Sequence, residues 1–131
     1  MTQFQPGDEI FGDLSGDGFG GFAEFVCASE DALASKPAKV SFEEAAAVPL
    51  AAVTALQGLR NKAQVRQGQK VLINGASGGV GTFAVQIAKS FGAEVTGLCS
   101  TSKADMVRSL GADHALITPR KISPRMGNTM T

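Results

Sequence analysis

The sequence lacks the features that mark nucleic-acid-binding and membrane proteins. Its 131 residues include 12 basic and 12 acidic side chains, so the formal net charge is zero. No basic stripe is present, which argues against a nucleic-acid partner. The longest apolar stretch, residues 45–56, is short and contains Pro49, so we expect no membrane span. The chain is long enough to form one domain with its own hydrophobic core.

Cysteine is also scarce. Cys27 and Cys99 lie in unrelated surroundings and form no metal-ligand motif. A reduced, cytosolic setting is the simplest interpretation. The N-terminus lacks the basic and apolar segments of a signal peptide. We therefore predict a cytoplasmic protein without a membrane partner.

The chain is organised around a glycine-rich turn. Residues 70–74 form a short apolar run typical of a buried strand, and residues 80–91 carry apolar side chains at helical spacing up to Gly92, a predicted helix stop. Between them lies Ala76-Ser-Gly-Gly-Val-Gly81, which fits the G-x-G-x-x-G fingerprint with Ala76 at the first glycine. A strand, a glycine turn and a helix N-terminus predict a dinucleotide phosphate site, with a plain glycine turn as the alternative.

The segments after this turn continue the same pattern. Residues 94–98 predict a second strand, and a helix follows from a cap at Ser102 to about Leu110. Gly111 ends that helix, and residues 112–117 predict a third strand. The order βαβαβ implies a parallel sheet, which is the first half of a Rossmann dinucleotide-binding domain in the α/β class.

The first third of the chain predicts short strands and turns. We expect strands at residues 9–11 and 22–26, separated by a glycine-rich linker over residues 12–21. A ligand-binding loop is the alternative for this linker. Residues 28–40 are interpreted as a polar connection.

Two helices are predicted before the glycine turn. Ser41-Phe-Glu-Glu44 has the spacing of a capping box. An alanine-rich helix follows, Pro49 interrupts it, and residues 50–61 form a second helix.

The end of the second strand indicates which cofactor is bound. An acidic residue there would select NAD by binding the ribose 2′-hydroxyl. No carboxylate occurs before Asp105, which falls inside the predicted helix. Ser100, Thr101 and Lys103 offer donors and charge that suit a 2′-phosphate, so we predict NADP(H). The alternative is that the hydroxyls only cap the helix and Lys103 is solvated.

Seven segments together resemble the medium-chain dehydrogenase/reductase superfamily, in its zinc-independent quinone-oxidoreductase branch. The resemblance implies that residues 1–36 are the C-terminal part of a GroES-like β domain and residues 37–117 part of an NADP-binding Rossmann domain. The segments are residues 6–12, 21–26, 45–50, 54–55, 75–81, 85–89 and 109–113.

The resemblance also implies an activity and a set of cofactor contacts. The activity is hydride transfer from NADPH to a small-molecule quinone or enone, without an essential acid or base. A homodimer is an expectation for the full-length relative only. By position, Thr54 would lie near the nicotinamide, the pyrophosphate would lie along Ser77, Gly78, Gly79 and Val80, and the 2′-phosphate would meet Ser100, Thr101 and Lys103.

The resemblance argues against zinc. Zinc-dependent relatives carry a cysteine four residues before the position of Thr54, where this chain has Leu50. No cysteine cluster follows the Gly7-Asp-Glu9 motif either. Leucine cannot bind a metal, so we predict a zinc-independent protein, and His114 is interpreted as structural.

Both ends of the chain depart from the family. By the resemblance, we expect the first strands of the GroES-like domain to be missing, and the resemblance stops near Asp113. We expect residues 118–131 to be a disordered tail, and a frameshifted reading of ordinary family sequence would explain it, with a genuine divergent tail as the alternative. A non-catalytic NADP-binding module and an inactive truncated product are therefore the competing hypotheses.

Overall fold

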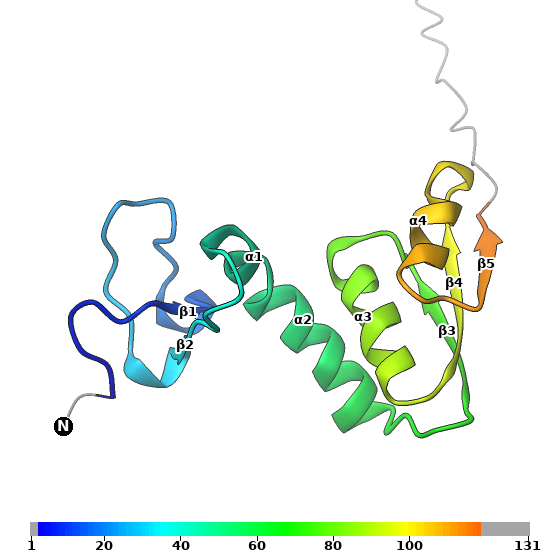
Figure 1. Ribbon diagram of the computed structural model, residues 1–131, viewed down its shortest axis with the longest axis horizontal. Coiled ribbons are helices and arrows are strands. Elements are labelled where there is room, and N and C mark those ends of the chain that lie inside the picture. The colour runs from blue at the N-terminus through cyan, green and yellow to red at the C-terminus, as the bar shows by residue number, and fades with distance from the viewer. Residues whose placement is uncertain (1–2, 119–131) are drawn as a thin grey trace, which may run out of the picture. The chain divides into compact units, whose positions relative to one another are not determined.

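The computed structural model describes residues 3–118 and divides into two compact units, Met1–Ala63 and Gln64–Thr131. Its elements are shown in Figure 1. The domain boundary predicted at residue 37 rests on the family resemblance and stays a prediction, whereas the compact units divide after Ala63. Apart from Thr118, the predicted tail lies outside the described residues.

The first unit contains a small antiparallel pair, β1 (Ile10–Gly12) and β2 (Leu33–Ser35), with Phe11 opposite Ala34. The predicted strand at 9–11 is thus confirmed within one residue. The strand predicted at 22–26 is wrong, because these residues form bends and coil with both phenylalanines exposed. β2 instead lies inside the predicted polar connection. Alternation in a short exposed segment does not make a strand, and three residues are too few to show a period.

A buried lysine joins this strand pair to the first helix. The Nζ of Lys36 lies 2.9 Å from Oε2 of Glu9 and 5.1 Å from the ring centre of Phe42. The Lys36 side chain is only 5% exposed, and its backbone N–H donates to the carbonyl oxygen of Glu9 at 2.8 Å. A buried ammonium group needs such partners, so Lys36 connects the β1–β2 strand pair to the first residue of the following helix.

Helices α1 (Phe42–Ala47) and α2 (Pro49–Leu56) follow, and a wider π-helical stretch, η3 (Gln57–Lys62), extends α2. The predicted capping box is confirmed: Ser41 Oγ accepts from the Glu44 N–H at 3.1 Å, and the Ser41 N–H donates to Glu44 Oε2 at 2.9 Å. Pro49 begins α2, where its missing N–H costs nothing.

The second unit is the predicted βαβαβ arrangement. Strands β3 (Lys70–Asn74), β4 (Glu94–Cys99) and β5 (His114–Ile117) are parallel in the order β3-β4-β5. Helix α3 (Gly79–Ser90) contacts β3 and β4, and α4 (Ala104–Ser109) contacts β4 and β5. The largest fully buried side chains, Val85, Val95 and Val107, come from α3, β4 and α4.

Glycines end both helices of this unit as predicted. Gly92 has φ +77° and Gly111 has φ +112°, a region where only glycine is unstrained. The Gly92 N–H donates to the carbonyl of Lys89 at 2.9 Å, and the Ala93 N–H to that of Ala88 at 3.2 Å. This is the Schellman arrangement.

The predicted cap at Ser102 is wrong. Helix α4 begins at Ala104, after a 3-10 turn, η4 (Thr101–Lys103). The Ser102 Oγ lies 3.3 Å from the Ser100 Oγ instead of accepting from the helix. Local hydrogen bonding between hydroxyl groups competes with capping at such positions.

Asp113 joins the start of β4 to the approach of β5. Its carboxylate accepts from the Val95 N–H at 2.7 Å and from Lys89 Nζ at 2.9 Å. The backbone hydrogen bond from Val95 and the Lys89 ammonium lower the pKa of Asp113 below its usual value. Separately, no helix among residues 3–118 is long and apolar enough to cross a bilayer.

Candidate cofactor site

The glycine turn leaves β3 sharply and enters α3. Gly75 adopts φ +69°, and its carbonyl oxygen accepts from the Gly78 N–H at 2.9 Å. The Ala76 N–H donates to the carbonyl of Leu98 at 3.0 Å, which fixes the turn to β4. One hydrogen bond within the turn and one to β4 therefore fix the conformation of the turn.

Gly81 allows α3 to approach this turn closely. A Cβ at Gly81 would lie 2.0 Å from the Gly75 carbonyl oxygen, a contact no side chain can make. This is the packing role of the last glycine in the dinucleotide fingerprint. The position is thus fixed by the backbone of the turn itself.

The departure at the first fingerprint position has a structural compensation. Ala76 is fully buried, and its methyl group lies against Gly97 in the middle of β4. A Cβ at Gly97 would lie 2.9 Å from Ala76 Cβ and 2.6 Å from Val107 Cγ1. An alanine therefore fits in the turn because the neighbouring strand has a glycine. An isolated glycine inside a strand signals such an approach, and the sequence analysis did not use this signal.

The N-terminus of α3 offers free donors. Gly78 is its N-cap, in extended conformation and without a capping side chain. Within residues 3–118, no acceptor pairs with the N–H groups of Gly79, Val80 or Gly81. Ser77 is half-buried just before them. Unpaired N–H groups at the positive end of a 12-residue helix suit a pyrophosphate.

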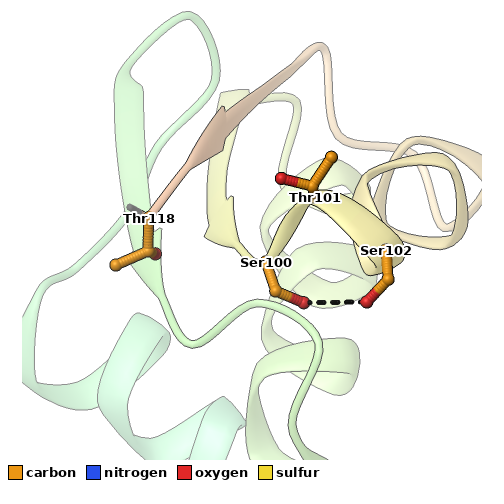
Figure 2. A pocket seen from close by; sticks show the side chains of 4 residues that line it. All are labelled: Ser100, Thr101, Ser102 and Thr118. Carbon is orange, nitrogen blue, oxygen red and sulfur yellow. Dashed lines mark hydrogen bonds between the residues drawn. The ribbon is translucent and has the colours of Figure 1, made fainter. Parts of the chain in front are cut away.

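A second polar feature lies at the carboxyl ends of β4 and β5. Ser100, Thr101, Ser102 and Thr118 line a pocket of about 410 Å³ (Figure 2). The Thr118 N–H donates to the carbonyl of Cys99 at 2.9 Å, which holds its segment beside β4. The sequence analysis missed Thr118 because it assigned this residue to the tail.

Lys103 does not line this pocket. It is the exposed residue immediately before α4, and its side chain makes no hydrogen bond with residues 3–118. The structure therefore places Ser100 and Thr101 in the lining of one pocket and Lys103 outside it, and their contact with a 2′-phosphate stays a prediction. Among the described residues, no carboxylate belongs to the lining.

Thr54 belongs to the first unit. Its Oγ1 donates to the Leu50 carbonyl oxygen at 2.6 Å, one turn earlier in α2. The hydroxyl proton is thus used within the helix, and the oxygen keeps lone pairs for a donor from outside. Elsewhere, His114 Nε2 lies 3.3 Å from Glu94 Oε1 across the sheet.

The chain shares extensive sequence with known reductases. Residues 79–127 match a family described as zinc-binding dehydrogenase. The chain is 45% identical over 121 residues to a chloroplast envelope quinone oxidoreductase homolog of Arabidopsis thaliana, covering 88% of this chain and 37% of that protein. It is 45% identical over 118 residues to a 2-methylene-furan-3-one reductase of Solanum lycopersicum, covering 84% of this chain and 30% of that protein. The crystal structure of CurK enoyl reductase matches with a TM-score of 0.82 and 41% identity, covering 91% and 35%.

The chain belongs to the medium-chain dehydrogenase/reductase superfamily. The predicted resemblance to its quinone-oxidoreductase branch is confirmed, as is the Rossmann-type α/β fold. The chain spans about a third of the length of these relatives. The family match also continues to residue 127, beyond Asp113, where the sequence analysis ended the resemblance.

The family description names zinc, but the described residues do not fit this metal. Residues 3–118 contain no group of three or more His, Cys, Asp or Glu side chains placed to hold an ion. Leu50 carries no ligand atom, and Cys99 is buried in the second unit. Independence from zinc stays a prediction from the sequence.

Proposed function

We propose that this chain is the cofactor-binding part of an NADPH-dependent reductase of quinones or enones. The observation that carries the proposal is the row of free N–H groups at Gly79, Val80 and Gly81, held at the end of a parallel strand by a rigid turn. The relatives named for quinone and furanone reduction support the reaction class.

The residues present fit both kinds of phosphate in the cofactor, the pyrophosphate and the separate 2′-phosphate. The glycine turn has no side chain at Gly78 or Gly79 to keep a pyrophosphate away, and nothing lies within 4 Å of a Cβ built at Gly79. The hydroxyl groups of Ser100 and Thr101 line a pocket to which residues 3–118 contribute no carboxylate. Lys103 adds a positive charge beside it, which favours a 2′-phosphate over a bare ribose hydroxyl.

When bound, NADPH supplies a hydride to the β-carbon of an enone or to a quinone, and a proton from water completes the saturated ketone or hydroquinone, with NADP⁺ as the oxidised product. The chain's own part is to bind and orient the cofactor. The Thr54 oxygen is free to accept a hydrogen bond from the carboxamide of the nicotinamide, because its own proton is donated to Leu50. Orientation of this ring decides the rate of hydride transfer.

A carboxylate at Gly79 tests the phosphate site. Asp suits the first turn of a helix, and the space at Gly79 is open, so Gly79→Asp should fold normally. It should weaken NADPH binding by at least about 2 kcal/mol through repulsion of the pyrophosphate. Titration calorimetry measures this loss, with Gly79→Ala as the uncharged control. Unchanged affinity in Gly79→Asp would contradict the assignment.

The activity is tested by NADPH oxidation with a benzoquinone and with a simple enone as acceptors. Thr54→Val removes the acceptor oxygen and should lower kcat about tenfold or more, while Thr54→Ser keeps it and should retain most of the activity. A protein that binds NADPH and reduces neither acceptor would be a cofactor-binding module, and the reductase proposal would be wrong.

A further inference from the structure

The ammonium group of Lys36 uses its whole hydrogen-bonding capacity inside the first unit. Besides the Glu9 carboxylate at 2.9 Å, its Nζ donates to the carbonyl oxygens of Pro37 at 3.2 Å and of Val40 at 2.5 Å. A lysine has three ammonium donors, so each of them has an acceptor. The Pro37 carbonyl also accepts from the Val40 N–H at 3.1 Å. Lys36 therefore holds both ends of the short turn that leads into α1.

Stability alone does not explain a buried lysine at this point. Taking an ammonium group out of water costs free energy that an ion pair does little more than return, and packed apolar side chains often stabilise a protein as well. The Lys36 side chain is 5% exposed but its partner Glu9 is 53% exposed, so water weakens the attraction between them. What the lysine supplies, and an apolar side chain cannot, is a set of directed hydrogen bonds.

The same side chain also contacts the first residue of α1. Val40 directly precedes Ser41, the N-cap of this helix. The Lys36 Nζ lies 5.1 Å from the ring centre of Phe42, and a cation is attracted to an aromatic face at this distance. One turn later Ala45 is buried, and α1 contacts β1. The start of α1 is thus fixed relative to the strand pair.

No loop separates α1 from the helix that carries Thr54. Val48 is both the C-cap of α1 and the N-cap of α2, and its backbone is helical, with φ −83° and ψ −49°. Its N–H donates to the Ala45 carbonyl at 3.2 Å, and its own carbonyl accepts from the Ala52 N–H at 2.8 Å. A displacement at the start of α1 is therefore passed on to α2 and to the Thr54 hydroxyl.

We infer that Lys36 is a positioning residue for the proposed reduction and that it acts through Thr54. The inference rests on the proposed function, in which the Thr54 oxygen accepts a hydrogen bond from the nicotinamide carboxamide. By fixing the turn before α1, the lysine fixes the direction of α2 and the place of that oxygen. Hydride transfer depends steeply on orientation, so a small displacement of the helix lowers its rate. NADPH affinity depends on the glycine turn of the second unit and should not change.

The test is a double-mutant cycle on the intact protein. It measures the single-turnover rate at which a benzoquinone oxidises bound NADPH. Lys36→Met keeps the length of the side chain and removes its donors, while Glu9 is exposed enough to stay hydrated. This variant should bind NADPH with a Kd within about twofold of the original and transfer hydride about tenfold more slowly. In a Thr54→Val background the same substitution should cost less than about twofold, because the contact that it positions is already lost.

Two further variants separate positioning from loss of charge and from failure to fold. Lys39 is an exposed lysine three residues along the chain, so Lys39→Met removes the same charge and should leave the rate within about twofold. Glu9→Gln leaves the ammonium group its two carbonyl acceptors and puts a neutral amide oxygen in place of the carboxylate. It should lower the rate about threefold, again only where Thr54 is present. Glu9→Gln carries the test if Lys36→Met does not fold.

The outcomes distinguish this inference from the function it rests on. Binding of NADPH without reduction of the quinone, or an unchanged rate in Thr54→Val, would overturn the proposed role of Thr54 and this inference with it. If Thr54→Val slows the reaction, then an unchanged rate in Lys36→Met, or equal losses in both backgrounds, would overturn the inference alone. An equal loss in Lys39→Met, or a loss accounted for by weaker NADPH binding, would also overturn it.

Discussion

The two units differ in how they are stabilised. In the described chain, the buried apolar side chains of the first unit are Ala45, Ala55 and Leu59, whereas those of the second come from β3, β4, α3, α4 and the turns between them. The first unit depends on point contacts such as the Lys36 network and the capping box at Ser41. The second unit is a packed α/β layer in which one methyl group decides whether a position fits.

This difference assigns different work to each unit. A packed layer holds the glycine turn in a fixed position, as the proposed recognition of a cofactor phosphate requires. The glycine-rich loop of the first unit is packed less tightly, and its phenylalanines Phe19, Phe22 and Phe25 are exposed. We therefore expect substitutions in the second unit to change stability by disturbing its close packing. Substitutions in the first unit should act by removing single local contacts.

The largest effect is expected at the contact between the turn and α3. Gly81→Ala places a Cβ 2.0 Å from the Gly75 carbonyl oxygen, so the helix or the turn must shift. We expect a loss of about 3 kcal/mol in the free energy of unfolding. Gly79→Ala, where the space is open, should change it by less than about 1 kcal/mol. Chemical denaturation measures both, and equal stability of the two variants would remove the claim of tight packing.

The next effect concerns the cofactor. Lys103→Ala should weaken NADPH binding by about 1–2 kcal/mol, the range of a charge-assisted hydrogen bond, and leave NADH binding unchanged. Lys103 lies outside the lining of the hydroxyl pocket and must turn toward the phosphate. If the loss is found in Ser100→Ala and not in Lys103→Ala, the hydroxyl groups alone select the 2′-phosphate.

In the first unit, Ser41→Ala removes the capping box. We expect a cost of about 1 kcal/mol, because an N–H of α1 loses its acceptor. Hydrogen exchange should become faster in α1 and remain unchanged in β4, since the units are compact separately. Faster exchange throughout both units would show that they unfold as one body.

The smallest effect is expected at Asp113. Its lowered pKa means that its contribution to stability is present above the unfolded value of about 3.8 and is lost as the pH falls through the lower folded value. The Tm of Asp113→Asn should therefore be lower than that of the original chain near neutral pH. At strongly acidic pH the two Tm values should become equal. A constant difference at every pH would exclude this titration as the cause.

The second unit was predicted well from the sequence because the apolar residues of its strands and helices pack against one another within the same unit. The period of α3, the stops at Gly92 and Gly111, and the three strands all follow from local patterns that the packing reinforces. The first unit was predicted less well. Strand β2 has only three residues, and it pairs with β1 although the two strands lie far apart in the sequence, so no local pattern indicates the pairing.

The candidate site divides in the same way. The glycine turn could be predicted from its glycines and from its place between a strand and a helix. Thr118 and the compensation between Ala76 and Gly97 depend on neighbouring strands, so they could not be assigned without the sheet.

The most direct test of this account is the binding of NADPH and NADH to the original protein, measured by titration calorimetry under the same conditions. We expect NADPH to bind more tightly by about 1–2 kcal/mol, because the described lining of the pocket at Ser100 and Thr101 offers hydroxyl donors and no carboxylate. Equal affinity for the two cofactors, or tighter binding of NADH, would contradict it.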